Sequence, residues 1–260
     1  MERRGCDGHL EKAANLLKQL DGRVDALGLG GANLFYHLGC RRYPFPAGQF
    51  LARQVKETPL VDGSGWKAYI DTQAVSQLSF LPLNSKALVV SVLDRFWLAQ
   101  SLEDAGFSVL AGDAAFGLRL PLLLPLSTFK KLAYLTMPAL CHLPLTYLYA
   151  PGSGTPQINR SLLDRCARIK IIAGDWRFIR RFILPALKGK VIITSGTNVA
   201  DRELLHRSGA AWLLTTTPLF AGINPAANAM EAALVALGLQ PPQYLEQARK
   251  YGWLPSLQQL

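Results

Sequence analysis

Three stretches of the sequence decide the fold: they read IKIIAGD at residues 169–175, KVIITSG at 190–196 and WLLTTTP at 212–218. Each begins with a short apolar run and ends in hydroxyl, glycine or aspartate residues. A segment with helical features follows each stretch, so a strand–helix unit occurs three times in succession. Repeated units of this kind predict a parallel sheet covered by helices. Ligands bind such sheets at the carboxyl ends of the strands.

The first half of the chain shows a similar alternation. Its predicted strands, with the turns that end two of them, lie at residues 24–33, 58–65, 86–92 and 107–111, and its predicted helices at 9–20, 46–56, 66–78 and 94–105. Each half is therefore expected to be an α/β unit of its own. The prediction is two Rossmann-like lobes with mainly parallel sheets, an N-terminal lobe at 1–117 and a C-terminal lobe at 157–260, with a cleft between them.

The lobes are expected to be joined by a proline-rich apolar connector at residues 118–156, which ends in a turn-rich linker. Its 132–150 part is as long as a membrane-spanning helix and has no Asp, Glu, Lys or Arg. However, Pro138, Pro144 and His142 would each be costly in a lone lipid-facing helix. We therefore expect a buried connection, with an interfacial lipid-binding segment or a membrane span as the alternatives.

Composition and charge limit the class of protein. Half of the 260 residues are hydrophobic and 18% are charged, a balance typical of a globular chain and not of a disordered one. The net charge of +10 favours an anionic partner, such as an anionic small molecule or an acidic lipid surface. No basic run is interleaved with aromatic residues, so nucleic acid is not expected as a partner. Peripheral membrane contact and a homodimer stay open.

The four cysteines have neither the spacing of a zinc site nor that of a disulfide framework, and no metal is expected. The N-terminal charges are not followed by an apolar segment, so no signal peptide is indicated. The expected location is cytoplasmic.

The glycine turn GLGGA at residues 28–32 is a candidate cofactor-binding site through Gly28, Gly30 and Gly31. Glycines let a backbone approach a pyrophosphate at a helix N-terminus. The third glycine of the dinucleotide pattern is replaced by Asn33, and the acidic residue expected about 20 residues later is missing. The alternative is a tight turn that needs a positive φ.

Polar residues at strand ends supply the other candidates. Hydroxyl groups and exposed N–H groups at a helix N-terminus hold phosphate well, although the same residues also cap ordinary helices. The further candidate cofactor-binding residues are Arg177, Thr194, Ser195, Thr197, Asn198, Thr215, Thr216, Thr217, Asn228 and Glu231. The candidate catalytic residues are Asp62, Asp113 and Asp175, which suit proton transfer or binding of a hydroxyl group. Capping of the following helix is the alternative for each aspartate.

The chain resembles a little-characterised bacterial family, often labelled quinate 5-dehydrogenase or quinate/shikimate dehydrogenase-like. The likeness lies at GDWRFIRR (174–181) and from TTTP (215–218) to NAMEA (228–232), and it extends over about residues 24–237. GLGGA also looks like the glycine turn of shikimate dehydrogenases. The resemblance implies a Rossmann-like fold, NADP or NAD as cofactor, and oxidation of a cyclic hydroxy acid. Shikimate dehydrogenases use a Lys–Asp pair, and the sequence alone does not locate such a pair in this chain.

Two functions follow from these patterns. The first is an NAD(P)-dependent oxidoreductase that binds a phosphorylated nucleotide, or a similar anionic ligand, in the interlobe cleft. The alternative is a non-catalytic ligand-binding or membrane-surface protein that uses the basic charge and the apolar segment 118–150.

Overall fold

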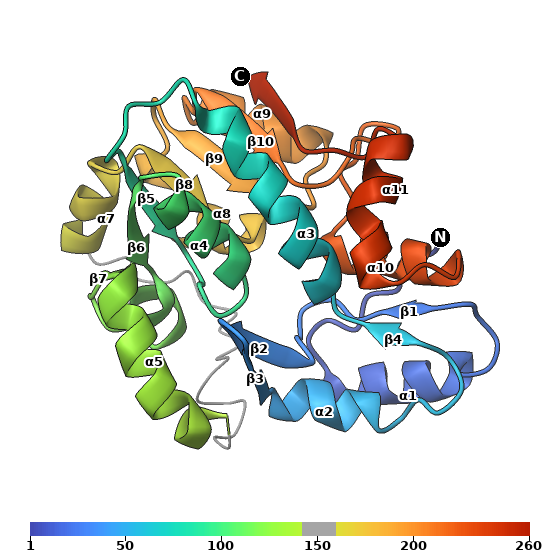
Figure 1. Cartoon of the computed structure of the whole chain (residues 1–260). Coiled ribbons are helices and arrows are strands. Elements are labelled where there is room, and N and C mark those ends of the chain that lie inside the picture. Colours follow the sequence, from blue (N-terminus) through green and yellow to red (C-terminus); the bar gives the residue numbers. More distant parts are fainter. Residues whose placement is uncertain (142–159) are drawn as a thin grey trace.

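The computed structural model describes residues 1–141 and 160–260. Its centre is one sheet of seven strands, with the N-terminal part of the chain, coloured blue, below it in Figure 1. The strands are β5 (Lys86–Val89), β6 (Ser108–Ala111), β7 (Leu124–Pro125), β8 (Ile171–Ala173), β9 (Val191–Thr194), β10 (Trp212–Thr215) and β11 (Ser256–Gln259). Their order in the sheet is β11-β10-β9-β8-β5-β6-β7.

The strand order reverses near the middle of this sheet. The strands from β10 to β6 are parallel, and the edge strands β7 and β11 are antiparallel to their neighbours. The chain passes from β5 outward to β6 and then returns to β8 on the other side of β5. The connection after β5 therefore runs to one side of the sheet and the connection after β8 to the other. A crevice forms between them at the carboxyl ends of β5 and β8.

The mixed α/β fold with a mainly parallel sheet is confirmed, but the expectation of a separate parallel sheet in each half is wrong. β5 and β6 pair with the strands of the second half, since Ala87 lies opposite Ile171 and Val89 opposite Ala173. The expected boundaries at residues 117 and 157 consequently cut through a continuous sheet. The run at 86–92 is as apolar as its counterparts at 169–173 and 190–194 because all three are central strands of the same sheet.

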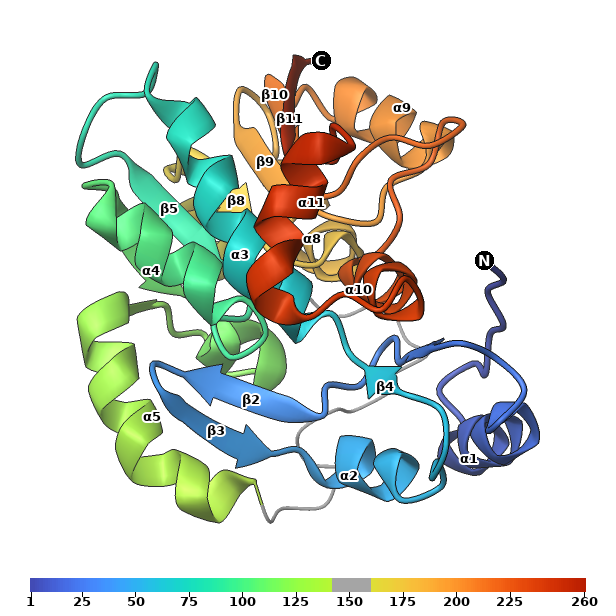
Figure 2. The same ribbon diagram turned by 45° about the vertical axis from the view of Figure 1, so that its right-hand side comes forward.

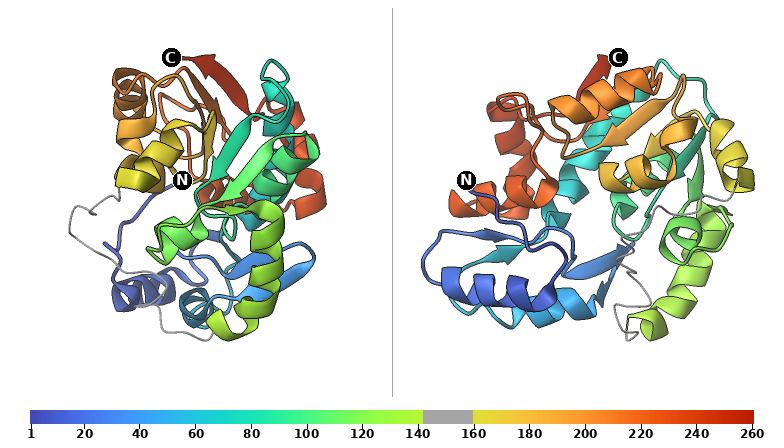
Figure 3. Two further views of the ribbon diagram at one scale, coloured as in Figure 1. Left: turned by 90° about the vertical axis from the view of Figure 1, so that its left-hand side faces the viewer. Right: turned by 180° about the vertical axis from the view of Figure 1, so that it is seen from behind.

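Helices cover both faces of the sheet. One face is covered by α3 (Ser64–Val75), α4 (Phe96–Asp104) and α5 (Leu126–Leu140), and the other by α7 (Arg160–Ala167), α8 (Trp176–Phe182) and α9 (Val199–Arg207). α3 and α4 lie toward the viewer in Figure 1, and α8 and α9 lie toward the viewer in the rear view of Figure 3. Val89 and Ile171 point into the first core, and Leu88 and Ile172 into the second. Because both faces are buried, these strands read as continuous apolar runs and not as alternating ones.

The N-terminal part forms a smaller layer of its own. It contains α1 (Leu10–Leu20), β1 (Leu27–Gly28), β2 (Phe35–Leu38), β3 (Arg41–Pro44), α2 (Pro46–Ala52) and β4 (Leu60–Val61). β1 and β4 pair in parallel, and β2 and β3 form an antiparallel hairpin. In Figure 2 the hairpin lies beside α5, where the Tyr134 hydroxyl donates to the Leu38 carbonyl over 3.1 Å. Ala14, Leu17, Leu27 and Leu51 make the small core of this part.

Two C-terminal helices connect the N-terminal part to the rest. α10 (Ala227–Ala236) and α11 (Tyr244–Lys250) pack against α3 around Trp66, Met230 and Tyr244. α10 also approaches β1 so closely that a Cβ atom on Gly28 would lie 2.7 Å from the Asn228 carbonyl oxygen. Short 3-10 segments at Ser76–Leu78, Leu184–Ala186 and Pro241–Gln243, and a π-helical turn at Asp113–Gly117, complete the described elements.

The expected connector contains β7, an edge strand of the sheet, and then α5, an amphipathic helix. Phe129 and Met137 belong to its buried face, whereas Leu132 and Leu135 are exposed. The expected burial is therefore found along one face of the helix only. Residues 142–156 of the connector lie outside the described residues. Within residues 1–141 and 160–260, no helix is both long and apolar enough to cross a membrane.

Candidate functional site

A cleft of about 130 Å3 lies at the reversal of strand order, at the carboxyl ends of β5, β8 and β9. The segments after these strands form one side of it, and residues 29–33, 36 and 45 of the N-terminal part form the other. Apolar walls come from Leu29, Val90 and Phe178. The polar lining includes the cations Lys67, Arg95 and Arg177, the carboxylates Asp62, Asp94 and Asp175, and the hydroxyls of Ser91 and Ser195. Apolar walls with a few converging polar groups are typical of small-molecule sites.

Lys67 and Asp94 form the central polar pair of the cleft. The Lys67 Nζ atom lies 2.6 Å from Asp94 Oδ1, and the Asn33 side-chain amide donates to the same oxygen over 2.9 Å. Their side chains are 12% and 24% exposed, so both remain accessible from the cleft. Burial favours the neutral form of Asp94, but the ion pair with Lys67, aided by Arg95 and Asn33, outweighs it and lowers the pKa of Asp94. The geometry is that of a strong charge-assisted hydrogen bond.

Arg95 lines the cleft and is almost completely buried. Its Nε atom lies 3.0 Å from Asp71 Oδ2 on α3, an ion pair that lacks hydrogen-bond alignment. The other guanidinium nitrogens donate to Ser195 Oγ over 3.3 Å and to Thr216 Oγ1 over 3.2 Å. Arg95 thereby links α3 and α4 to the ends of β9 and β10. Burial raises the pKa of Asp71 to about 6, although the Arg95 charge acts in the opposite direction.

Asp175 and Arg177 lie at the rim and pair with each other. Asp175 is the N-cap of α8 and accepts the Arg177 backbone N–H over 2.7 Å. The Arg177 guanidinium lies 3.2 Å from the same carboxylate. Both predicted residues therefore line the cleft. Asp175 also caps α8, which is the alternative role that the sequence left open for it.

The glycine turn lines the cleft through Gly30 and Gly31, but α10 occupies the space beside it. The Asn228 side chain donates to the Gly28 carbonyl over 3.2 Å. A Cβ atom on Gly30 would lie 3.3 Å from the Asn228 Nδ2 atom. The close approach that glycine permits at Gly28 and Gly30 is made by α10, whereas nothing lies within 4 Å of an added Cβ atom on Gly31.

A dinucleotide does not fit this site. The cleft volume of about 130 Å3 is below the roughly 300–1,000 Å3 of clefts that hold drug-sized ligands. Asn228 closes the Gly28 and Gly30 side of the turn as well. The arrangement suits a smaller molecule held at Lys67, Asp94 and the hydroxyl groups around them.

The other two candidate aspartates hold backbone in place. Asp62 lines the cleft, yet its two oxygens accept the backbone N–H groups of Leu34 over 2.6 Å and Ser64 over 3.0 Å. Asp113 lies outside the cleft lining and accepts the N–H groups of Val92 over 2.8 Å and Leu93 over 3.1 Å. Burial raises the pKa of Asp113 to about 6. Asp113 therefore holds the backbone of the segment after β5 in place and does not line the cleft.

Most of the remaining candidate cofactor-binding residues also lie outside the cleft. The residues in this group are Gly28, Thr194, Thr197, Asn198, Thr215, Thr216, Thr217 and Glu231, whereas Ser195 and Asn228 line the cleft. Thr197 donates to the Asn224 side chain over 2.8 Å, and Asn224 donates to the Thr217 carbonyl over 2.8 Å. Asn198 caps α9 in a capping box with Asp201. The contacts of Asn224 with Thr197 and Thr217 hold the segment after β10 in place, and Asn198 has the capping role that the sequence left open.

Glu231 is buried behind the start of α3. Burial and the neighbouring charge of Asp62 raise the pKa of Glu231 to about 7, while the backbone N–H groups of Gly63 and Gly65 and the charge of Lys67 act against this rise. Its Oε2 atom has no hydrogen-bond partner among the described residues.

The buried carboxylates predict a pH dependence of stability. Glu231, Asp113 and Asp71 have folded pKa values of about 7, 6 and 6, above their ordinary values of 4.5 and 3.8. Each takes up a proton on folding between those limits, so this stabilisation is complete below about pH 4 and is lost as the pH rises to 7. We expect the free energy of unfolding, measured with urea, to fall by at least about 1 kcal/mol between pH 4.5 and 7.5. Asp94, whose pKa is lowered, acts only at more acidic pH. A stability that increases over this interval would contradict the prediction.

Lys67, Asp94, Arg95 and Asn33 were not predicted as site residues from the sequence. Lys67 and Asp94 are 27 residues apart, so no local motif connects them. One signal was available. Lys67 lies at the beginning of α3, where the helix dipole disfavours a cation, and such a placement calls for an anionic partner nearby.

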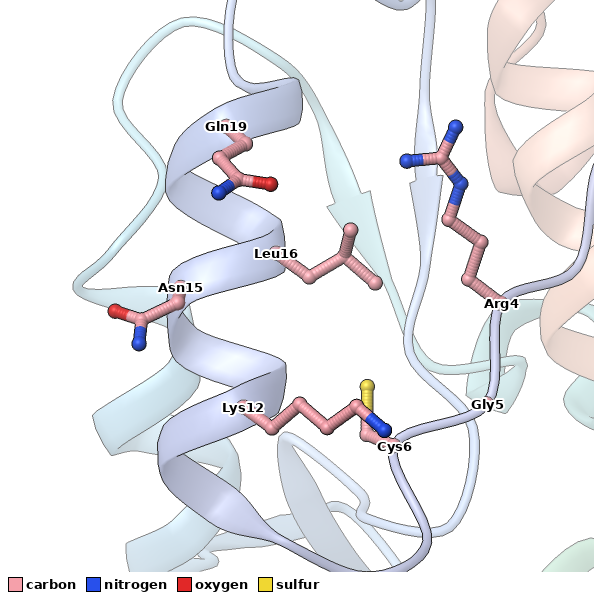
Figure 4. A pocket seen from close by; sticks show the side chains of 7 residues that line it. All are labelled: Arg4, Gly5, Cys6, Lys12, Asn15, Leu16 and Gln19. Atoms are coloured by element: carbon pink, nitrogen blue, oxygen red, sulfur yellow. The ribbon is translucent and has the colours of Figure 1, made fainter.

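A second hollow, of about 520 Å3, lies between residues 4–6 and α1 (Figure 4). In Figure 4 the Lys12 side chain extends toward Cys6. Its cations are engaged on the surface, Lys12 with Asp7 and Arg4 with Glu2. The hollow is larger than the cleft but lacks converging buried polar groups. Residues 1–141 and 160–260 contain no group of three side chains suited to hold a metal ion.

Comparison with known proteins gives a family without an assigned activity. Residues 65–260 match a family described as a domain of unknown function, DUF8754, and residues 1–62 match DUF8753, also a domain of unknown function. No curated protein matches the sequence significantly. A solved ABC transporter solute-binding protein from Burkholderia multivorans, with an unknown ligand, is 9% identical with a TM-score of 0.42, over 98% of this chain and 83% of that one. This TM-score is too low to support a shared fold or ligand.

Proposed function

Since the chain belongs to the DUF8754 family, a domain of unknown function, we propose its function from the cleft: it binds a small hydroxylated anion, a carboxylate or a phosphate, between its N-terminal part and its sheet. Lys67 is the proposed anion-binding residue. Asp94, Asn33 and the hydroxyls of Ser91 and Ser195 are proposed to bind the hydroxyl groups of the ligand.

One observation carries the proposal: the Lys67–Asp94 pair, with Nζ and Oδ1 2.6 Å apart, lies inside a cleft at the reversal of strand order. A surface ion pair would contribute little and would need no such surroundings. Here the pair is largely shielded from water, where its charges interact more strongly with a ligand. A Lys–Asp pair is also what the resemblance to shikimate dehydrogenases implies, and it supports a hydroxy acid such as quinate or shikimate as the ligand.

The start of α10 favours an anion as well. Ala226, Ala227 and Asn228 line the cleft, and Ala226, the N-cap, provides no side-chain cap. The first N–H groups of a helix carry partial positive charge and interact favourably with anions. α10 and Lys67 thus place positive potential on the same side of the cleft.

We expect quinate, shikimate or inorganic phosphate to raise the melting temperature of the purified protein, because a ligand that binds only the folded state stabilises it. Replacing Lys67 with methionine is expected to weaken binding of the responding ligand at least tenfold, about 1.4 kcal/mol, in isothermal titration calorimetry. Lys12→Met is the matched control, since Lys12 forms a Lys–Asp pair of 3.4 Å on the open surface.

Two results would overturn the proposal. One is a melting temperature unchanged by all three anions, and the other is a Lys67→Met protein that binds as well as the Lys12→Met protein. NAD and NADP belong in the same panel. Binding of either would show that the cleft opens to a dinucleotide, and would support the oxidoreductase that the resemblance implies.

A further inference from the structure

The segment between β10 and α10 exposes a group of large apolar side chains. Residues 217–226 read TPLFAGINPA and contain no charged residue. Leu219, Phe220 and Ile223 are 55%, 41% and 55% exposed. Single apolar side chains on a surface need no explanation, but a group of them indicates an interaction site. Residues 219–223 are called the apolar turn below.

Hydrogen bonds fix the shape of the apolar turn. The N–H groups of Phe220 and Ile223 each donate to the carbonyl of the other residue, over 2.8 and 2.9 Å, and close a tight hairpin. Asn224, directly after the turn, is buried and accepts from the Arg202 guanidinium over 3.1 Å. Arg202 also donates to the Gly222 carbonyl inside the turn. The apolar side chains are therefore presented by a defined structure, and binding does not first have to order a loose loop.

A row of aromatic rings connects the apolar turn to a cation. The Phe220 ring lies 5.8 Å from the Trp253 ring, and the Trp253 ring lies 4.9 Å from the Tyr251 ring. The Lys250 Nζ atom lies 5.7 Å from the centre of the Tyr251 ring. In Figure 1 the end of α11, which carries Lys250, lies next to the segment that follows β10. The surface thus changes from apolar side chains to Trp and Tyr, and then to a cation.

The same order of polarity occurs at the surface of a lipid bilayer. Apolar side chains reach the acyl boundary, Trp and Tyr are enriched at the interface, and Lys and Arg are attracted to anionic headgroups. The net charge of +10 adds a long-range attraction to an anionic surface. The same charge repels a second copy of the chain, so the turn fits an anionic bilayer better than it fits its own copy.

We propose that the apolar turn docks the protein on a lipid bilayer that contains anionic lipid. Leu219, Phe220 and Ile223 enter the interface, and the exposed Arg249 and Lys250 lie at the headgroups. This surface is separate from the apolar segment at 118–150, which was the candidate for membrane contact from the sequence. The proposal does not depend on which ligand the cleft binds.

Co-sedimentation with vesicles of phosphatidylcholine and phosphatidylserine tests the docking. We expect the wild type to sediment with these vesicles, and to do so less at high salt, because salt screens the attraction of the cations to the headgroups. The double variant Leu219→Asn with Ile223→Asn should bind at least about tenfold more weakly, since two apolar side chains no longer leave water. Both side chains are exposed in the free protein, so the melting temperature of this variant should stay close to that of the wild type.

The matched control replaces two exposed leucines of α5. Leu132 and Leu135 are 46% and 78% exposed, and they belong to the other apolar segment. The double variant Leu132→Asn with Leu135→Asn should bind the vesicles as the wild type does. The two double variants therefore show which of the two apolar surfaces contacts the lipid.

A fluorescent label shows whether the turn itself enters the bilayer. Ile223→Cys, in a protein with Cys6→Ser and Cys40→Ser, gives an exposed thiol in the turn, while Cys141 and Cys166 are buried. A nitrobenzoxadiazole label on this thiol should shift its emission to the blue when the vesicles are added, because its surroundings become apolar. An emission unchanged by vesicles that carry the protein would contradict insertion of the turn.

Three further results would overturn the proposal. The first is a wild type that does not sediment with the anionic vesicles. The second is a turn variant that sediments as well as the wild type. The third is a wild type that forms dimers in sedimentation equilibrium without lipid, together with a turn variant that stays monomeric, because the turn would then be a contact between copies of the chain.

Discussion

Replacing Arg95 with methionine is expected to lower the free energy of unfolding by about 3–5 kcal/mol. Arg95 is 2% exposed and Asp71 is fully buried, with Nε and Oδ2 3.0 Å apart. The variant leaves the Asp71 carboxylate without a countercharge in a site that water does not reach. It also removes the donors to Ser195 and Thr216, which join the ends of β9 and β10 to α4.

Urea unfolding of the wild type and the variant measures this loss. The double variant Asp71→Leu with Arg95→Met removes both charges and should be more stable than Arg95→Met alone, because no unpaired buried charge remains. Arg4→Met is the matched control, since Arg4 pairs with Glu2 on the open surface and should leave the stability nearly unchanged. A loss below 1 kcal/mol for Arg95→Met would contradict the prediction. It would show that Asp71 becomes protonated or hydrated when Arg95 is removed.

Replacing Gly48 with alanine is expected to destabilise the protein by about 1–3 kcal/mol, the usual cost of overpacking. A Cβ atom at this position of α2 would overlap the backbone carbonyl of Asn33, and a main-chain group cannot move aside as a flexible side chain can. The displacement should also reach the cleft, because Asn33 donates to Asp94 over 2.9 Å.

Differential scanning calorimetry would measure the loss, and binding of the ligand identified for the wild type would measure the effect on the cleft. Gly117→Ala is the control, because nothing lies within 4 Å of an added Cβ atom there and its φ is not positive. The interpretation fails if both alanine variants melt at the same temperature.

The central strands could be predicted because their apolar runs are determined locally. The runs at 86–92, 169–173 and 190–194 are strands in the structure because both faces of a parallel sheet exclude water. The division into two sheets was wrong because strand pairing between β5 and β8 leaves no mark on either segment alone. The β2–β3 hairpin was missed as well. It follows directly after the glycine turn, at residues 35–44, where neither a strand nor a helix was predicted.

The place of the cleft could be predicted from the sequence, but most of the residues that line it could not. The rule that ligands bind at the carboxyl ends of strands leads to Asp175 and Ser195, and both line the cleft. It also leads to Thr194 and Thr215, which do not line the cleft. A strand end contributes residues that point into the core as well as residues that face the cleft. Lys67 and Asp94 come from the starts of two helices, and their pairing depends on how α3 packs on α4.

The contact between Gly28 and Asn228 joins positions 200 residues apart in the chain. Contacts of such long range close late in folding, because the entropy of the intervening loop must be lost first. In a nascent or partly unfolded chain the two sides of the cleft are consequently apart. Such a chain has no binding site at all, and not a weaker one. Ligand bound as proposed would then act as a non-covalent cross-link between the N-terminal part, through Asn33, and the segments after the strands, through Ser91 and Ser195, and its release should accompany the first step of unfolding.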